Sequence, residues 1–105
     1  MFGLVEFSVV PIGTGDASVS EYVKTAYDIL KSSGLNFELN SMGTIVEGDI
    51  KKILDIIIKI NQKLEDKKLK RIITSIKIDY RIDKKSTLKG KINSVIGDKN
   101  EQKNT

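Results

Sequence analysis

"LNFELNSMGTIVEGDI", residues 35–50, combines a hairpin and the start of a helix in one short run, and this run decides the fold. Apolar and polar residues alternate strictly over 35–40, which is typical of a strand with one buried face. The step Ser41-Met42-Gly43 is a short connection, and residues 44–47 form the partner strand. Asp49 is a favourable N-cap for the next helix. The segment therefore predicts an antiparallel hairpin that runs directly into a helix.

On the N-terminal side of this hairpin, the sequence predicts one strand and one helix. Residues 3–10 carry an apolar side chain at every second position on one face, as a half-buried strand does. Ser18 and Glu21 have the spacing of a capping box, so we expect a helix to begin at Ser18. Gly34 stops that helix, because glycine readily takes the left-handed conformation that ends a helix.

On the C-terminal side, isoleucine and leucine recur at helical spacing after Asp49 and predict a second amphipathic helix. Residues 71–82 alternate and predict a long last strand. Apolar residues between Leu88 and Ile96 indicate a short C-terminal helix, which Gly90 weakens. We expect one domain over residues 1–97, followed by a disordered polar tail over 98–105.

The elements follow each other in the order β-α-β-β-α-β. Right-handed crossovers and an antiparallel middle hairpin leave one compact arrangement, a four-stranded antiparallel sheet of order 4-1-3-2 with both helices on one face. We therefore predict an α+β protein with a ferredoxin-like fold.

Composition excludes several classes of chemistry. The chain has 105 residues, no cysteine and no histidine, so catalytic triads and imidazole metal sites are absent, and we predict a protein that is not an enzyme and holds no metal. The net charge is +4, but the lysines alternate with acidic residues and lack aromatic partners, which disfavours nucleic acid. No apolar run could span a bilayer, and we expect a cytoplasmic protein with no membrane partner.

The predicted sheet has one face without helices and two unpaired edges. Lys77, Asp79 and Arg81 alternate along the last strand, which is typical of a salt-bridge ladder within a chain or between subunits. Unpaired edges favour self-association, here a homodimer or homotetramer. The alternative is that the C-terminal helix folds back and covers these groups within one chain.

Two further features bear on ligands. The turn Gly13-Thr14-Gly15 precedes a capped helix but lacks the pattern of a phosphate loop, so a structural turn is the better interpretation. Glu47 precedes a glycine, and a carboxylate there needs a donor or a cation. If Glu47 points to the open face, Lys77 or Arg81 could supply the cation. If it points towards the helices, the ring nitrogen and amino group of a ligand would suit it.

Three segments, "PIGTGDASVSEYV", "SGLNFELNSMGTIVEGD" and "RIITSIKIDYRIDKKSTLKGKINSV", resemble the thiamine-binding protein family in order and spacing over about residues 3–96. The resemblance implies a ferredoxin-like fold, dimers and tetramers, and non-catalytic binding of thiamine or its hydroxymethylpyrimidine part as a ligand and not as a cofactor. Relatives often carry histidine where this chain has Asn61, and a second acidic residue where it has Tyr80.

An aminopyrimidine pocket needs an acid, hydroxyl groups and an apolar or sulfur-containing wall. The predicted ligand-binding residues that supply these groups are Thr14, Ser18, Ser20, Met42, Thr44 and Glu47. Tyr22 or Phe7 could stack on the ring. The alternative function is a structural or regulatory oligomerisation domain with no small-molecule ligand.

Overall fold

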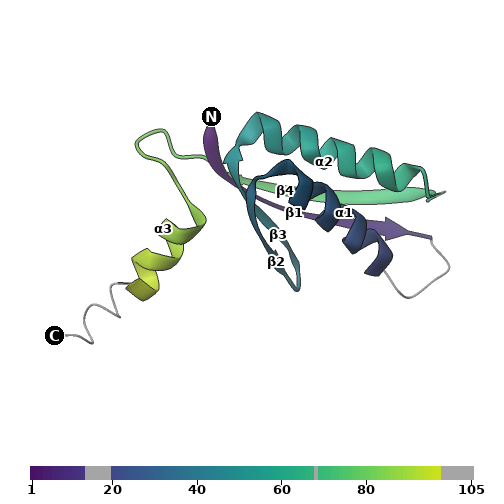
Figure 1. The fold of residues 1–105 in the computed structure, drawn as a ribbon, viewed down its shortest axis with the longest axis horizontal. Coiled ribbons are helices and arrows are strands. Elements are labelled where there is room, and N and C mark those ends of the chain that lie inside the picture. The colour runs from purple at the N-terminus through teal and green to yellow at the C-terminus, as the bar shows by residue number, and fades with distance from the viewer. Residues whose placement is uncertain (14–19, 68, 98–105) are drawn as a thin grey trace.

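The computed structural model describes residues 1–13, 20–67 and 69–97. Within these ranges the chain forms a four-stranded sheet and three α-helices, with a π-helical turn at Asn93–Gly97 (Figure 1). In chain order the elements are β1 (Phe2–Ile12), α1 (Ser20–Ser33), β2 (Asn36–Asn40), β3 (Gly43–Asp49), α2 (Ile50–Glu65), β4 (Arg71–Asp79) and α3 (Leu88–Ile92).

The sheet is antiparallel throughout, and its strand order is β2-β3-β1-β4. This is the predicted 4-1-3-2 order read from the other edge, so the ferredoxin-like fold is confirmed. Val5 in β1 lies opposite both Val46 in β3 and Ile78 in β4. The two central strands are therefore β1 and β3, and the two edge strands are β2 and β4.

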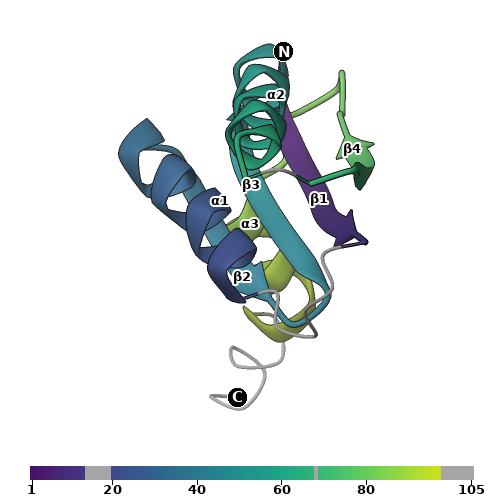
Figure 2. The same ribbon diagram turned by 90° about the vertical axis from the view of Figure 1, so that its right-hand side faces the viewer.

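The core lies between the sheet and the helices α1 and α2, which cover the same face (Figure 2). Alternation on β1 and β3 turns Val5, Phe7 and Val46 towards the helices, and each of these side chains is buried. Helix α2 supplies the largest share of the core because apolar residues recur along its inner side. These buried α2 residues are Ile50, Ile53, Ile57, Ile60 and Leu64.

Two predicted helix boundaries are confirmed. Asp49 caps α2, and its Oδ2 accepts a hydrogen bond from the Lys52 N–H at 3.1 Å. Helix α1 ends at Ser33, and Gly34 follows with φ +75°. The predicted cap at Ser18 and the predicted disordered tail over 98–105 both lie outside the described residues.

The end of the last strand differs from the prediction. Strand β4 stops at Asp79 instead of residue 82, because its pairing with β1 runs from Ile12 opposite Arg71 to Leu4 opposite Asp79. Beyond this point β1 has almost no length left, so the pairing ends there. An apolar alternation in the sequence does not report where the neighbouring strand ends.

The C-terminal helix is also shorter than its apolar pattern suggests. Thr87 caps α3, with its Oγ1 accepting a hydrogen bond from the Gly90 N–H at 2.8 Å. A Cβ atom at position 90 would lie 2.7 Å from this oxygen, so the glycine makes the close approach possible. The helix projects away from the sheet and leaves Ile92 exposed (Figure 1).

Within the described residues no helix is both long and apolar enough to cross a lipid bilayer.

Candidate functional site

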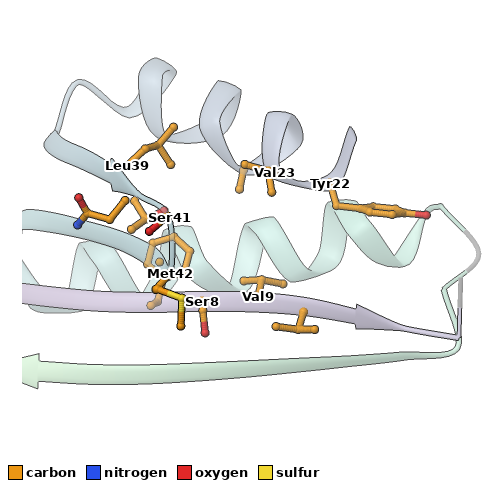
Figure 3. A pocket seen from close by; sticks show the side chains of 13 residues that line it. Ser8, Val9, Tyr22, Val23, Leu39, Ser41 and Met42 are labelled. Carbon is orange, nitrogen blue, oxygen red and sulfur yellow. The ribbon is translucent and has the colours of Figure 1, made fainter. Parts of the chain in front are cut away.

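A cavity of about 210 Å³ lies between α1 and the sheet, beside the turn that joins β2 to β3 (Figure 3). Strand β1 forms its floor and α1 forms its roof. Its lining comes from Phe7, Ser8, Val9, Val10, Tyr22, Val23, Ala26, Leu39, Asn40, Ser41, Met42, Gly43 and Thr44. It therefore draws on three strands, one helix and one turn.

The cavity exists because α1 covers this end of the sheet loosely. Leu30, near the end of α1, is fully buried, whereas Tyr22 and Ala26, nearer its start, are only half-buried against the core. The small side chain of Ala26 leaves space above the sheet. Thr44 shares the helix-facing side of β3 with Val46, because side chains alternate along a strand. The C-terminal end of α1 therefore packs closely on the sheet, whereas its N-terminal end leaves space for the cavity.

The lining is apolar with a few polar groups. Val9, Val23 and Leu39 form the walls, and Ser41 lies at the turn (Figure 3). Thr44 is 8 % exposed and contributes a hydroxyl group to the lining. Among the described residues, none of the lining side chains carries a charge. The arrangement suits a small neutral ring that forms hydrogen bonds.

Two of the predicted ligand-binding residues, Met42 and Thr44, line this cavity together with the predicted stacking residues Phe7 and Tyr22. Met42 is 89 % exposed and stands at the rim. Thr14 and Ser18 lie outside the described residues, and Ser20 is the first residue of α1. The structure thus places the turn residues and the buried hydroxyl group in one site.

Glu47 does not belong to this cavity. It is three residues from Thr44 on the same strand, so the two side chains point to opposite faces of the sheet. On the open face, Glu47 Oε2 accepts a hydrogen bond from the Leu88 N–H at 2.8 Å. The donor is thus the backbone of the C-terminal segment, and neither Lys77 nor Arg81 is its partner. Thr44 and Glu47 therefore do not line the same cavity within the chain.

The three charged residues predicted as a ladder lie at the end of β4 and just beyond it. Lys77 lies opposite Glu6, and Asp79 lies opposite Leu4, on the open face of the sheet. Arg81 follows the end of β4 and makes an ion pair with Asp83, two residues further along. Hydrogen bonding to Asp83 raises the pKa of Arg81, and the same bond lowers the pKa of Asp83. A ladder between subunits stays a prediction.

The two positions that depart from the family pattern lie away from the cavity. Asn61 connects α2 to β4, because its Oδ1 accepts a hydrogen bond from the Thr74 Oγ1 at 3.0 Å. Its Nδ2 donates to the Ile57 carbonyl at 2.9 Å. Tyr80 follows β4 and is partly exposed. Asn61 therefore has a structural role in this chain.

On the α1 side of the cavity, the sequence pointed to Tyr22 but not to Val23 or Ala26. Val23 and Ala26 belong to the apolar stripe of α1, and a stripe normally indicates core packing. The one available signal was the small size of Ala26 among larger apolar residues. Ser41 was predicted only as part of the hairpin turn, although the adjacent Met42 was predicted to bind the ligand.

Within the described residues, no group of three or more His, Cys, Asp or Glu is placed to hold a metal ion. The fold and the cavity together define a small ferredoxin-like domain with a largely apolar cavity beneath its first helix. The chain belongs to the thiamine-binding protein family, whose model matches residues 5–96.

Two relatives match this chain over most of their own length. The UPF0045 protein MJ1052 of Methanocaldococcus jannaschii is 38 % identical over 92 residues, which cover 88 % of this chain and 90 % of the relative. The UPF0045 protein YqgV of Bacillus subtilis is 36 % identical over 96 residues, covering 88 % of this chain and 92 % of the relative. The similarity therefore extends over almost the whole domain.

Solved structures agree with this assignment. The crystal structure of the hypothetical protein MJ1052 from Methanocaldococcus jannaschii superposes with a TM-score of 0.82 at 37 % identity, covering 90 % of this chain and 95 % of that one. A candidate thiamine biosynthesis/salvage protein, TM0486 of Thermotoga maritima, superposes with a TM-score of 0.77 at 26 % identity, covering 90 % and 98 %. Family and structural neighbour both indicate a role related to thiamine.

Proposed function

We propose that this protein is a non-catalytic binder of thiamine or its hydroxymethylpyrimidine part, and that the pyrimidine ring occupies the cavity beneath α1. The observation that carries the proposal is the cavity of about 210 Å³, whose described lining carries no charged side chain and includes the nearly buried Thr44. Membership of a family of thiamine-binding proteins supports the choice of ligand.

The size of the cavity favours one ring over two. Pockets for drug-sized ligands usually enclose about 300–1,000 Å³, and this cavity is smaller. A pyrimidine ring would fill it, and the thiazolium ring of thiamine would extend towards the exposed Met42 and into water. Keeping the cationic ring in water avoids the cost of burying a charge among uncharged side chains.

The polar groups of the cavity match those of an aminopyrimidine. A threonine hydroxyl both donates and accepts hydrogen bonds, so Thr44 can serve a ring nitrogen or the exocyclic amino group. The thioether of Met42 can contact the edge of an aromatic ring. Val9, Val23 and Leu39 give the ring faces apolar contacts.

The test is a calorimetric and thermal-shift titration with hydroxymethylpyrimidine, thiamine and the isolated hydroxyethylthiazole. We expect the first two ligands to bind and the third to fail. A ligand at 100 times its dissociation constant should add about 2.7 kcal/mol to the free energy of unfolding. Binding of the thiazole alone, or no stabilisation by either pyrimidine at millimolar concentration, would contradict the proposal.

Three variants locate the site. Thr44→Val keeps the shape of the side chain but removes its hydroxyl, so affinity should fall about fivefold for one hydrogen bond of about 1 kcal/mol. Ala26→Leu fills the cavity and should abolish binding. Glu47→Gln changes the opposite face of the sheet and should leave affinity unchanged. If Glu47→Gln weakened binding and Ala26→Leu did not, the site would lie on the open face instead.

The protein is further proposed to act as an oligomer. One observation favours the alternative of an oligomerisation domain without a ligand, namely that the edge strand β4 leaves Ile76 and Ile78 nearly half exposed. In that case the titrations above would show no binding, and assembly would be the only measurable property.

A further inference from the structure

A second cavity, of about 270 Å³, lies in the segment that connects β4 to α3. This segment runs beside the start of β1 (Figure 1). The lining residues are Arg81, Lys84, Lys85, Ser86, Thr87, Gly90 and Ser94. Apart from the glycine, every side chain in this described lining is basic or carries a hydroxyl group. The cavity therefore differs in its chemistry from the largely apolar cavity beneath α1.

The segment around this cavity is anchored to the rest of the fold. Ser86 and Leu88 are buried, at 5 % and 9 % exposure. The Leu88 N–H donates a hydrogen bond to Glu47 Oε2 at 2.8 Å, and Thr87 caps α3. Because these contacts fix the backbone, a ligand that binds here need not order a loose loop, which lowers the entropic cost of binding.

Two of the basic side chains are also oriented by the protein. The Lys85 ammonium group lies over the Phe2 ring, with its Nζ 4.1 Å from the ring centroid. This contact holds the side chain in place, but an aromatic ring supplies no counter-charge. Arg81 donates from its Nε and Nη2 atoms to Asp83, and a guanidinium group has further N–H donors. The cavity thus has cationic groups in defined positions.

Positive charge is in excess along the segment. Residues 79–89 include four basic and two acidic residues. The acidic residues are Asp83, which forms the ion pair with Arg81, and Asp79, which lies close enough to act on the same guanidinium group. Lys84 and Lys85 add two further cations to the lining. Like charges repel each other, and a bound anion would offset this repulsion.

A buried hydroxyl group without a partner is a second, independent sign of a ligand. The Ser86 Oγ is buried and has no hydrogen-bond partner among the described residues. Buried polar atoms in folded proteins nearly always have such a partner, so an exception needs an explanation. Because Ser86 lines the cavity, its O–H group can donate to an oxygen atom of a molecule bound there.

These donors suit a phosphate group better than other anions. A phosphate monoester carries roughly two negative charges near pH 7 and several strong acceptor oxygens, whereas a carboxylate carries a single charge. Single-stranded nucleic acid is disfavoured, because its bases stack on free aromatic rings and the Phe2 ring already has Lys85 over it. The chemistry therefore points to a phosphate group on a small molecule.

We propose that the cavity between β4 and α3 binds the phosphate group of a small soluble molecule, with Lys84, Lys85 and Ser86 as its main contacts. The site does not rest on the proposed pyrimidine ligand. Lys85 lies over Phe2, whereas the cavity beneath α1 contacts β1 from Phe7 to Val10. Five residues of strand separate Phe2 from Phe7, roughly 17 Å at ~3.4 Å per residue.

The first test is calorimetry and thermal unfolding of the full chain with inorganic phosphate and with pyrophosphate, using acetate as the control anion. All three titrations are made at one ionic strength, so that general screening is the same in each. We expect saturable binding of both phosphates, with a rise in the unfolding temperature, and neither effect with acetate. Equal effects of phosphate and acetate would overturn the proposal.

Two lysine variants separate a site from a general attraction to anions. Lys85→Gln removes a cation that lines the cavity and should weaken phosphate binding at least about tenfold, as expected for a hydrogen bond to a charged group. Lys89→Gln is the matched control, because it removes the same charge from the same segment at a residue outside the lining. This control should change the affinity by less than about twofold, since exposed charges are screened. Equal weakening in both variants would overturn the proposal.

Ser86→Ala tests the unpartnered hydroxyl group. In phosphate-free buffer its stability should equal or exceed that of the wild type, because the variant removes a buried polar atom that has no described partner. Its affinity for inorganic phosphate should nevertheless be lower. A loss of stability in phosphate-free buffer, or an unchanged affinity, would overturn the role of Ser86.

Lipid vesicles distinguish a soluble ligand from a lipid headgroup, which carries the same phosphate chemistry. The full chain is sedimented with vesicles of phosphatidylglycerol and, as the neutral control, of phosphatidylcholine. We expect the protein to stay in solution with both. Binding to phosphatidylglycerol vesicles without binding of inorganic phosphate or pyrophosphate would overturn the assignment to a small soluble molecule.

Discussion

The two edges of the sheet differ in length and in how the chain covers them. Strand β2 at one edge has five residues, and α1 lies over it. The rings of Tyr27 in α1 and Phe37 in β2 pack edge to face, with their centroids 5.7 Å apart. Strand β4 at the other edge has nine residues, and two of its isoleucines are nearly half exposed. Two helices cannot cover four twisted strands equally, so Phe37 on β2 is half-buried beneath α1, whereas Leu39 on β2 and Ile76 and Ile78 on β4 stay exposed.

This difference separates the two proposed functions of the molecule. At the β2 edge the covering helix leaves a small cavity, which suits a ligand. At the β4 edge, among the described residues, Ile76 and Ile78 are nearly half exposed, which suits self-association. The following experiments test how much the side chains at and near the two edges contribute to the stability of the fold.

The largest effect is expected on α2, where adjacent residues point to the core and to the open edge. Ile57 is buried, so Ile57→Ala should lower the free energy of unfolding by about 2–5 kcal/mol. Ile58→Ala removes the same atoms from an exposed position and should cost less than about 1 kcal/mol in the isolated chain. Chemical denaturation at low protein concentration measures both. Equal losses would mean that the β4 side of α2 is already buried within one chain.

The second-largest effect is expected on hydrogen exchange at Leu88, where the C-terminal segment contacts the open face of the sheet. Glu47→Ala removes the carboxylate that accepts the Leu88 N–H. A hydrogen bond to a charged group contributes about 1.5 kcal/mol or more, so the Leu88 amide should exchange its hydrogen at least tenfold faster. Hydrogen exchange followed by NMR measures this rate. The amide of Val46 on the same strand is the internal control, and its protection should not change.

The third effect measures how firmly the β2 edge is closed. Phe37→Leu keeps an apolar side chain but removes the ring that meets Tyr27. An aromatic pair contributes about 0.5–1.5 kcal/mol beyond its buried area, so we expect a loss of about 1 kcal/mol. Thermal unfolding measures it, with Leu39→Ala as a comparison on the same strand. No loss in Phe37→Leu would mean that α1 lies on β2 without stabilising it.

The smallest effect is a pH dependence that involves neither edge. The Lys52 N–H bond to Asp49 is the main reason that the pKa of this carboxyl group lies below its ordinary value of 3.8, and the N-terminal ammonium group contributes. Since the folded state binds this proton less readily, the stabilisation is present above pH 3.8 and is lost as pH falls through the folded pKa. Asp49→Asn keeps a good N-cap but cannot titrate, so its stability should fall less between pH 5 and pH 2. Parallel acid titrations of the two proteins would contradict this.

The order and type of the elements could be predicted because the local signals agree with the tertiary structure. The alternation over 35–40, the cap at Asp49 and the stop at Gly34 each depend on neighbouring residues only. The end of β4 could not be predicted in this way, because it depends on where β1 runs out, some seventy residues earlier in the chain. Sequence periodicity describes a strand but not the length of its partner.

The candidate site was predicted only in part for a similar reason. Met42 and Thr44 were found because they lie on the hairpin that the sequence identified. Glu47 was grouped with them, but the register of β3 turns it to the other face, where Leu88 binds it. Val23 and Ala26 were missed because lining a cavity and packing a core demand the same apolar residues. Residues that are close together along a strand can thus lie on opposite faces of the sheet.

The glycine in α3 limits how this protein can be engineered. Replacing a glycine inside a helix with alanine usually gains about 1 kcal/mol, so Gly90 looks like an obvious target for stabilisation. Here the added methyl group would lie 2.7 Å from the Thr87 oxygen that caps the helix. Displacing that oxygen would lose a cap of about 1 kcal/mol, so the usual gain is cancelled. A design effort would do better to leave this position alone and to lengthen the helix elsewhere.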